Sequence, residues 1–328
     1  MSDKPLFPCR SVIHTMLSYT VYNRAGGQSK SVLTRDLAAA HAEQGQKVLI
    51  IDLDAQKGSV SSFYDLDYDK NDGNSDRLTL HIIDRPAGEF SDLIHNAEPG
   101  VDIVPRHEEL NDLGEILDDK EAIESRGIEG NEFDRYTELF RVLKENGIPE
   151  EYDVLICDPN AKADDAYYSA LYATRNVLIP AATTPKGVAS IDDVFDTASN
   201  FADAKNINIG NLGVVATQAN LQKGTQKEVA EELRDDHDAI CYFKELSIYD
   251  DTDYAQESLF PHIKNLDRVR KSQADVLPKY RTLLSHIQNK VGSPLPASKV
   301  DEYEFWTGDD YWGDVSVPVA NENEVEAK

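Results

Sequence analysis

The sequence has few cysteines, few aromatic residues and no long apolar run. Three cysteines (Cys9, Cys157 and Cys241) are too few and too far apart for a disulfide framework or a cysteine-rich metal site. No segment approaches the roughly 20 consecutive apolar residues that cross a bilayer. Residues 1–16 also lack the apolar stretch of a secretory signal. We therefore expect a protein of the reducing cytoplasm that does not enter the membrane.

Basic residues are scarce as well. Lysine and arginine together number 33 against 60 acidic residues, which gives a formal net charge of −27 at pH 7. Such a surface repels nucleic acids and anionic membranes unless a local patch reverses the sign. The acidic residues are interspersed among periodic apolar segments, which argues against a disordered acidic protein. We interpret the charge as that of a halophilic protein, whose surface stays dispersed in concentrated salt.

Strand and helix patterns alternate along most of the chain. Residues 18–22 alternate as a strand does, residues 31–44 have helical spacing, and residues 47–53 form a continuous apolar run typical of a strand buried on both faces. Further strands are predicted at 101–105, 153–158, 177–180 and 212–216, with helices at 135–147 and 190–203. This order predicts a doubly wound α/β domain with a mostly parallel sheet and helices on both faces.

The predicted domain covers residues 18–292, and the two ends of the sequence fall outside its pattern. Residues 1–17 are expected to be an N-terminal extension. The segment 293–328 contains nine acidic residues and both tryptophans, Trp306 and Trp312, and is expected to be an acidic tail. Its tryptophans could dock a partner or fold back on the domain. Within the domain, residues 64–76 are rich in Asp, Asn and Gly and are expected to form a solvated loop.

The loop after the first predicted strand has the character of a phosphate-binding loop. It consists of Asn23-Arg24-Ala25-Gly26-Gly27-Gln28-Ser29-Lys30-Ser31. Small residues allow the backbone to close around an anion, and the amides of the following helix point at it. Lys30 can reach the β- and γ-phosphates, and Ser31 can offer its hydroxyl to Mg²⁺. The usual glycine before the lysine is Ser29 here, so a plain strand–helix turn with a surface lysine is the alternative.

Acidic residues stand at the ends of two other predicted strands. Asp54 follows the strand at 47–53, and Asp158 ends the strand at 153–158. Ligands of open α/β sheets bind outside the carboxyl ends of the strands. We therefore expect Lys30, Asp54 and Asp158 to surround a magnesium–nucleotide complex. Either carboxylate alone would suit a strand that simply emerges into solvent.

Together these motifs resemble the ParA/MinD group of deviant-Walker P-loop ATPases, and among them the ParA partition ATPases of halophilic archaea. The loop resembles the family's N-x-K-G-G-x-G-K-[ST], residues 48–56 resemble V-L-x-I-D-x-D-P-Q, and residues 152–158 resemble Y-D-x-x-x-x-D. The resemblance implies that Lys30 contacts the phosphates and that Asp54 positions the attacking water. Ser31 would bind Mg²⁺, and Asp158 would support it through water. The nucleotide-binding residues would be Gly26, Gly27, Gln28, Ser29, Lys30 and Ser31.

The resemblance also implies partners. ATP would promote a homodimer that binds DNA without sequence preference on the nucleoid, and a centromere-binding ParB-like partner would stimulate slow hydrolysis. One departure is notable, because the family's signature lysine falls on Ala25, which cannot carry its charge. A nucleotide-gated positioning switch for other cargo and a degenerate ATP-binding scaffold therefore remain alternatives. A membrane role of the MinD kind fits less well, since the sequence ends in an acidic tail.

One segment reverses the sign of the charge. Seven basic residues lie between Lys264 and Lys290 against two acidic ones, and apolar residues at helical spacing predict a C-terminal helix there. An exposed basic face could neutralise DNA phosphates. A solvated helix face that relieves the acidic surroundings is the alternative. The DNA-binding candidates are Arg268, Arg270, Lys271, Lys279 and Arg281.

Overall fold

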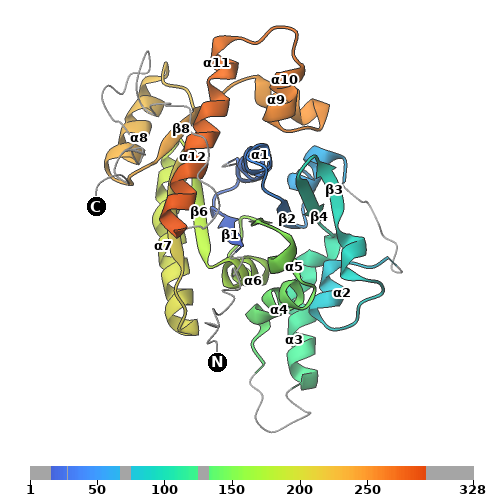
Figure 1. Ribbon diagram of the computed structural model, residues 1–328. Coiled ribbons are helices and arrows are strands. Elements are labelled where there is room, and N and C mark those ends of the chain that lie inside the picture. Colours follow the sequence, from blue (N-terminus) through green and yellow to red (C-terminus); the bar gives the residue numbers. More distant parts are fainter. Residues whose placement is uncertain (1–15, 28, 67–74, 125–132, 293–328) are drawn as a thin grey trace, which may run out of the picture.

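The computed structural model describes residues 16–27, 29–66, 75–124 and 133–292. Within these residues one sheet has the strand order β3-β4-β2-β5-β1-β6-β7-β8 (Figure 1). Every neighbouring pair of strands is parallel except β3 and β4, which run antiparallel at one edge. The predicted doubly wound α/β fold with a mostly parallel sheet is confirmed.

The elements have the following bounds. The strands are β1 Leu17–Val21, β2 Val48–Leu53, β3 His95–Glu98, β4 Val101–Val104, β5 Val154–Pro159, β6 Asn176–Ala182, β7 Gly210–Ala219 and β8 Cys241–Lys244. The helices are α1 Lys30–Glu43, α2 Leu78–Ile82, α3 Leu113–Glu124, α4 Glu138–Glu145, α5 Ile148–Glu151, α6 Asp165–Thr174, α7 Pro185–Lys205, α8 Gly224–Asp235, α9 Ile248–Ala255, α10 Leu259–Asn265, α11 Lys271–Ala274 and α12 Val276–Val291. Short 3₁₀ turns occur at Val60–Tyr64, Phe90–Leu93, Glu108–Asp112 and Arg135–Thr137.

The helices cover both faces of the sheet. In Figure 1, α1 and α6 lie on opposite sides of β1. Right-handed crossovers require this, because the connection from β1 to β2 and the connection from β5 to β6 run in opposite directions across the sheet. Helix α1 packs against α10 and α12, and α6 packs against α4. Because β1, β5 and β2 are neighbouring parallel strands, their carboxyl ends lie side by side at one end of the sheet, between its two helical layers.

Helix α1 is a central helix rather than a surface one. All nine residues from Leu33 to His41 are buried, including the charged residues Arg35 and Asp36. The reason is that β2 and β5 pack on one side of α1 while α10 and α12 pack on the other. A helix surrounded in this way needs no polar face, and its amphipathic pattern is correspondingly weak.

Some sequence expectations were incomplete. The predicted helix at 135–147 begins as a 3₁₀ turn and becomes α-helical only from Glu138. The edge strands β3 and β8 were not predicted. Residues 67–74 of the expected loop, residues 1–15 and the acidic tail with Trp306 and Trp312 lie outside the described residues. Among the helices that the structure describes, none combines the length and hydropathy needed to cross a membrane.

Candidate functional site

The loop after β1 is anchored to the sheet at both ends. The buried Asn23 side chain donates a hydrogen bond from Nδ2 to the Pro180 carbonyl on β6 (2.8 Å) and accepts one from the Ala25 amide (2.8 Å). At the other end, Gln218 on β7 donates to the Gly27 carbonyl (2.8 Å) and to the Ser29 hydroxyl (2.9 Å). Strands β6 and β7 thereby fix the loop over the start of α1.

Two of the described residues of this loop adopt left-handed backbone conformations. Gly27 has φ = +75° and Ser29, the last residue before α1, has φ = +59°. Glycine reaches this region without steric cost, whereas serine does so less readily. Ser29 thus adopts a conformation typical of glycine at the position where the sequence has serine in place of the usual glycine.

The first turn of α1 faces a hollow of about 460 Å³. Lys30 and Ser31 are the first residues of this helix, whose free amide groups and positive dipole end favour an anion. The hollow is lined by Arg24, Gly26, Gly27, Ser29, Lys30, Ser31, Val32, Asp54, Gln56, Lys57, Gly58, Phe63, Asn160, Ala161 and Lys162. A basic, glycine-containing hollow at a helix N-terminus is suited to a polyphosphate.

Asp54 brings a carboxylate into this hollow from the end of β2. Its Oδ1 accepts a hydrogen bond from the Gln56 amide (2.9 Å), which fixes the side chain beside the hollow. Burial raises the pKa of Asp54, while the nearby charges of Lys30 and Arg106 lower it. A half-buried carboxylate of this kind can orient a water molecule and accept its proton.

Asp158 lies on β5 directly opposite Asp52 on β2, and both side chains are fully buried. Asp52 is well satisfied, because it accepts hydrogen bonds from Ser59, from Ser61 and from the Asp54 amide. Neither carboxylate oxygen of Asp158 has a hydrogen bond of ordinary geometry among the described residues. Burial, and then the neighbouring Asp52, raise the pKa of Asp158, while Lys30 and Ser31 lower it.

A buried carboxylate without hydrogen-bond partners lowers the stability of the folded state unless a ligand supplies the missing partners. Asp158 with the adjacent Ser31 hydroxyl fits a hydrated Mg²⁺ ion. No group of three or more His, Cys, Asp or Glu side chains among the described residues is arranged to hold a metal. Mg²⁺ at phosphate sites keeps several waters and uses one or two protein ligands plus the phosphates.

A second hollow of about 570 Å³ adjoins the first at Ser29 and Val32. Its other walls come from α1, the ends of β7 and β8, the loop after β8, α9 and α12: Leu33, Thr217, Gln218, Phe243, Lys244, Glu245, Leu246, Ser247, Tyr249, Asp250, Asp253 and Tyr280. It combines aromatic rings with polar groups, as pockets for small organic ligands do. The two hollows together form an elongated site, basic at one end and partly aromatic at the other.

The structure brings most of the predicted site residues together. Those that line the first hollow are Gly26, Gly27, Ser29, Lys30, Ser31 and Asp54, and Asp158 lies near enough to Lys30 and Ser31 for both to lower its pKa. Gln28 lies outside the described residues. Ala25 is 4% exposed. Sequence reasoning missed Lys57 and Lys162, although each closely follows an acidic residue at a strand end.

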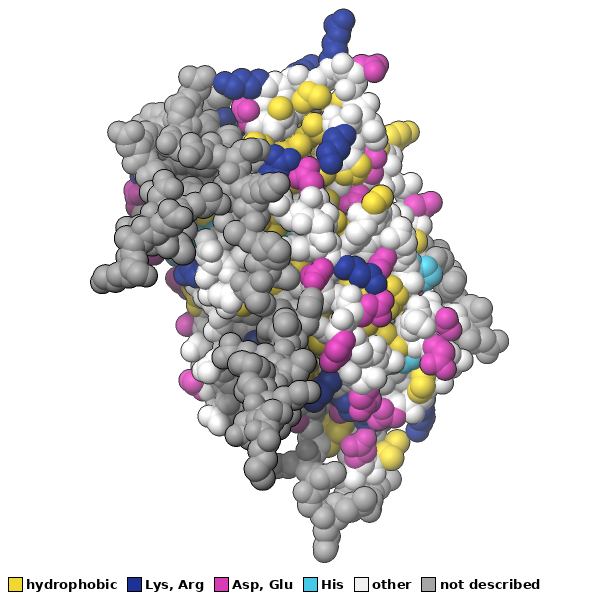
Figure 2. Space-filling model, in the orientation of Figure 1, with side chains coloured by type: hydrophobic (Ala, Val, Ile, Leu, Met, Phe, Trp, Pro, Cys, Tyr) yellow, Lys and Arg dark blue, Asp and Glu magenta, His cyan; other side chains and the backbone are white. Residues whose placement is uncertain are grey.

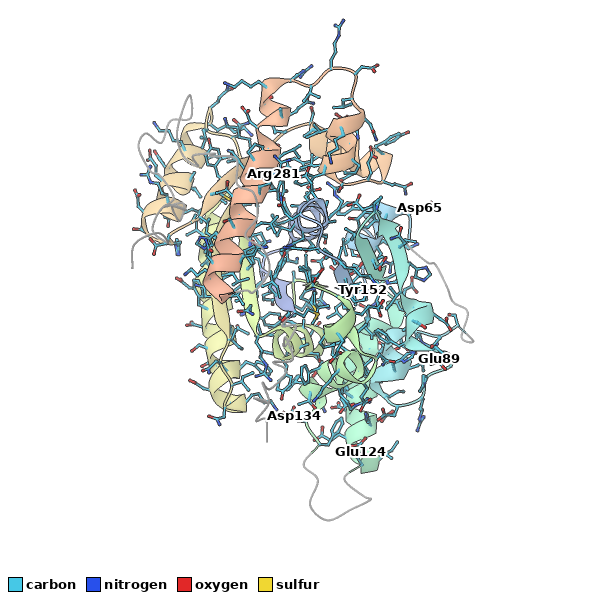
Figure 3. The ribbon with its side chains drawn as sticks, in the orientation of Figure 1. Asp65, Glu89, Glu124, Asp134, Tyr152 and Arg281 are labelled. Atoms are coloured by element: carbon cyan, nitrogen blue, oxygen red, sulfur yellow. The ribbon has the colours of Figure 1, made fainter. Side chains whose placement is uncertain are left out.

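The basic C-terminal segment is less uniform than expected. Lys279 is wrong as a DNA-contacting candidate, because it is buried, donates to the Tyr242 carbonyl (3.2 Å) and lies over the Tyr242 ring. Arg281, labelled in Figure 3, forms a two-pronged pair with Glu43 of α1 (2.9 and 3.0 Å). Arg268 and Arg270 are exposed between α10 and α11, and Lys271 is exposed at the first position of α11. Figure 2 shows basic side chains at that end of the molecule.

Comparison with known proteins places the chain in a family. The family model described as AAA domain matches residues 16–210, more than half of the chain, and the chain belongs to this family. An uncharacterized protein of Methanocaldococcus jannaschii is 24% identical over 67% of this chain and 80% of its own length. An uncharacterized protein of Mycobacterium tuberculosis is 26% identical over 63% of this chain and 59% of its own length.

Several solved structures share the fold. A cobyrinic acid a,c-diamide synthase from Mycobacterium smegmatis, with bound ATP analog and magnesium, has a TM-score of 0.65 at 19% identity and covers 87% of this chain and 99% of its own. The ATP complex of McdA from Cyanothece has a TM-score of 0.64 at 18% identity, covering 86% and 98%. A plasmid partition protein from Borrelia burgdorferi has a TM-score of 0.59 at 16% identity, covering 84% and 99%. The fold is that of ParA/MinD-like P-loop NTPases.

Proposed function

We propose that the chain is a Mg²⁺-dependent ATPase of the ParA partition type, which binds ATP and hydrolyses it slowly. The observation that carries the proposal is the convergence of the α1 N-terminus and Asp54 at one basic hollow, with the buried Asp158 close to Lys30 and Ser31. The ATP analog, ATP and magnesium named for two proteins of the same fold support it. The fold alone would not, since one fold hosts many functions.

We assign a different part of the nucleotide to each of the two hollows. The phosphates would occupy the hollow at Lys30, where loop amides and the helix dipole neutralise their charge, and the nucleoside would occupy the hollow beside Tyr249. Ser31 and, through water, Asp158 would hold Mg²⁺, which neutralises charge on the phosphates when bound. Asp54 would orient the attacking water at the far side of the phosphates.

Partition activity adds partners to this site. We include in the proposal an ATP-dependent homodimer, non-specific DNA binding on the nucleoid, and a centromere-binding ParB-like partner in a halophilic cytoplasm. Alanine at position 25 leaves this position without the charge of the family's signature lysine. We therefore expect weak turnover from the chain alone.

We expect Asp54→Ala to lower the turnover number by about 100-fold or more, because an oriented general base contributes roughly that factor. ATP binding should persist, since the phosphate loop and Lys30 are unchanged. Phosphate release in multimolar KCl, with nucleotide affinity measured in parallel, tests this. Asp203→Ala, at the exposed C-terminal end of α7, is the matched control and should behave as the wild type. Full turnover in the Asp54 variant would remove Asp54 from the mechanism.

We expect the combined variant Arg268→Glu, Arg270→Glu, Lys271→Glu to lose ATP-dependent DNA binding, because charge reversal turns phosphate attraction into repulsion. A gel shift with duplex DNA at physiological salt measures this. The control is Arg85→Glu with Lys144→Glu, two exposed residues near α2 and α4 at the other end of the molecule (Figure 1). An unchanged shift in the triple variant would show that this segment does not contact DNA.

A degenerate ATP-binding scaffold is the second candidate, favoured by alanine at position 25. ATP that is bound but not turned over, with no effect of DNA, would support it. Hydrolysis without any response to DNA would instead favour a positioning switch for other cargo.

A further inference from the structure

The phosphate hollow concentrates positive charge in a strongly acidic protein. Its lining contains four basic residues, Arg24, Lys30, Lys57 and Lys162, and a single acidic one, Asp54. In the whole sequence acidic residues outnumber basic ones by 60 to 33. In the lining, basic residues therefore outnumber acidic ones, which favours the binding of an anion that carries several charges.

Lys162 stands out among these four residues. Lys30 belongs to α1, and Arg24 lies 3.9 Å from Asp193. The Lys162 side chain is exposed and forms no ion pair within the part of the chain that the structure describes. Its ammonium group is available to a ligand.

The backbone at Lys162 is held in a defined position. The Lys162 amide donates to Asn160 Oδ1 (2.6 Å), and Asn160 Nδ2 donates to Asp164 Oδ2 (2.9 Å). Asp164 in turn caps the N-terminus of α6 by accepting from the Tyr167 amide (3.3 Å). This short turn links the end of β5, which carries Asp158, to α6. The root of the Lys162 side chain is thus fixed beside the site, and only the side chain itself is free to move.

The two hollows indicate which phosphate Lys162 would meet. Ser29 and Val32 line both hollows, so they mark the junction between nucleoside and phosphates. Asp54, Asn160 and Lys162 line only the phosphate hollow. A nucleotide that extends from the second hollow across Ser29 therefore places its inner phosphates on the loop. Its terminal phosphate then lies at the end where Asp54 and Lys162 stand.

We propose that Lys162 contacts the terminal phosphate of a bound nucleoside triphosphate and lets the site distinguish ATP from ADP. The inference rests on the proposed function, since it assumes that the hollow holds a nucleotide. It assigns Lys162 a specificity role at the outer phosphate, whereas Lys30 and the loop amides serve both nucleotides. The cation reaches the phosphate from the loop after β5, in the same subunit.

The experiment measures the affinities of AMPPNP and ADP, each with Mg²⁺, by calorimetry at one fixed KCl concentration. In Lys162→Ala, AMPPNP affinity should fall about tenfold, as expected for one charge-assisted hydrogen bond at a partly exposed site. ADP affinity should stay within about twofold, because its phosphates do not reach Lys162. Lys162→Arg should keep the discrimination. Lys144→Ala is the control, because it removes an equal charge from an exposed position on α4, away from the site. It should also keep the preference for AMPPNP over ADP.

The outcomes separate this inference from the proposed function. Wild-type protein that binds neither nucleotide would contradict the proposed function itself. If the wild type prefers AMPPNP and the Lys162→Ala protein keeps that preference, the function stands and the inference fails. Equal losses for both nucleotides would assign Lys162 a structural or general electrostatic role and would also overturn the inference.

Discussion

Replacement of Arg35 by methionine is expected to lower the free energy of unfolding by about 3–5 kcal/mol, because it strands a buried charge. Arg35 is fully buried in α1 and pairs with the equally buried Asp36 (3.0 Å). It also binds Asp253 (2.6 Å) and the Thr252 hydroxyl (2.9 Å) at the end of α9. Without the guanidinium group, Asp36 would remain inside the protein with no opposite charge.

Urea unfolding at constant KCl concentration measures this loss, and Lys47→Met provides the control. Lys47 forms an exposed pair with Glu151 (2.7 Å), so its replacement should cost less than about 1 kcal/mol. If both substitutions lower the free energy of unfolding by the same small amount, the buried pair contributes no more to stability than a surface pair. Asp253 also lines the second hollow, so the Arg35 network joins the central helix to the wall of the nucleotide site.

Replacement of Asp158 by asparagine is expected to stabilise the ligand-free protein at pH 8–9, by on the order of 3 kcal/mol. Burial and Asp52 raise the pKa of Asp158 from its ordinary value of 3.8 to about 8. Between these two values the folded state binds more protons than the unfolded chain. The stability of the wild type therefore falls as the pH rises from about 4 to about 8. Asparagine carries no such proton, so the advantage of the variant should vanish near pH 4.

Thermal unfolding with and without Mg²⁺ and ATP completes this test. Ligand that binds only the folded state raises the unfolding temperature. The unfolding temperature of the wild type should rise more with Mg²⁺ and ATP together than with ATP alone. The Asp158→Asn protein should lose this additional rise. Asp102→Asn, whose half-buried side chain lies on β4, is a control with the same change of side chain. An equal magnesium response in the Asp158 variant and the wild type would exclude Asp158 from the metal site.

The sequence was sufficient to predict those parts of the site that follow directly from strand order. The loop at 23–31, Asp54 and Asp158 all stand at the carboxyl ends of parallel strands, and the rule for open α/β sheets brings such ends together. The register between β2 and β5 was not predictable, because continuous apolar runs contain no signal for it. That register places Asp52 opposite Asp158 and raises the pKa of the latter.

Charged residues were the main source of error, because burial depends on what packs around a helix. The sequence contains no signal that Arg35 and Asp36 are buried, because their burial depends on the elements packed on α1. For Lys279 a signal was present. It lies three residues after Val276 and four before Leu283, and so belongs to the buried stripe of α12. The number of basic residues in the segment carries no information about which of them lie on the buried face of the helix.

Asn23 has a consequence for how quickly the site can exchange its ligand. Its side chain holds the backbone between β1 and the phosphate loop through the Pro180 carbonyl and the Ala25 amide, two contacts made within the protein itself. A preorganised segment loses little conformational entropy when a ligand arrives. Association should then proceed at the pace of a rigid pocket, and differences in affinity among nucleotides should appear mainly as differences in their residence times.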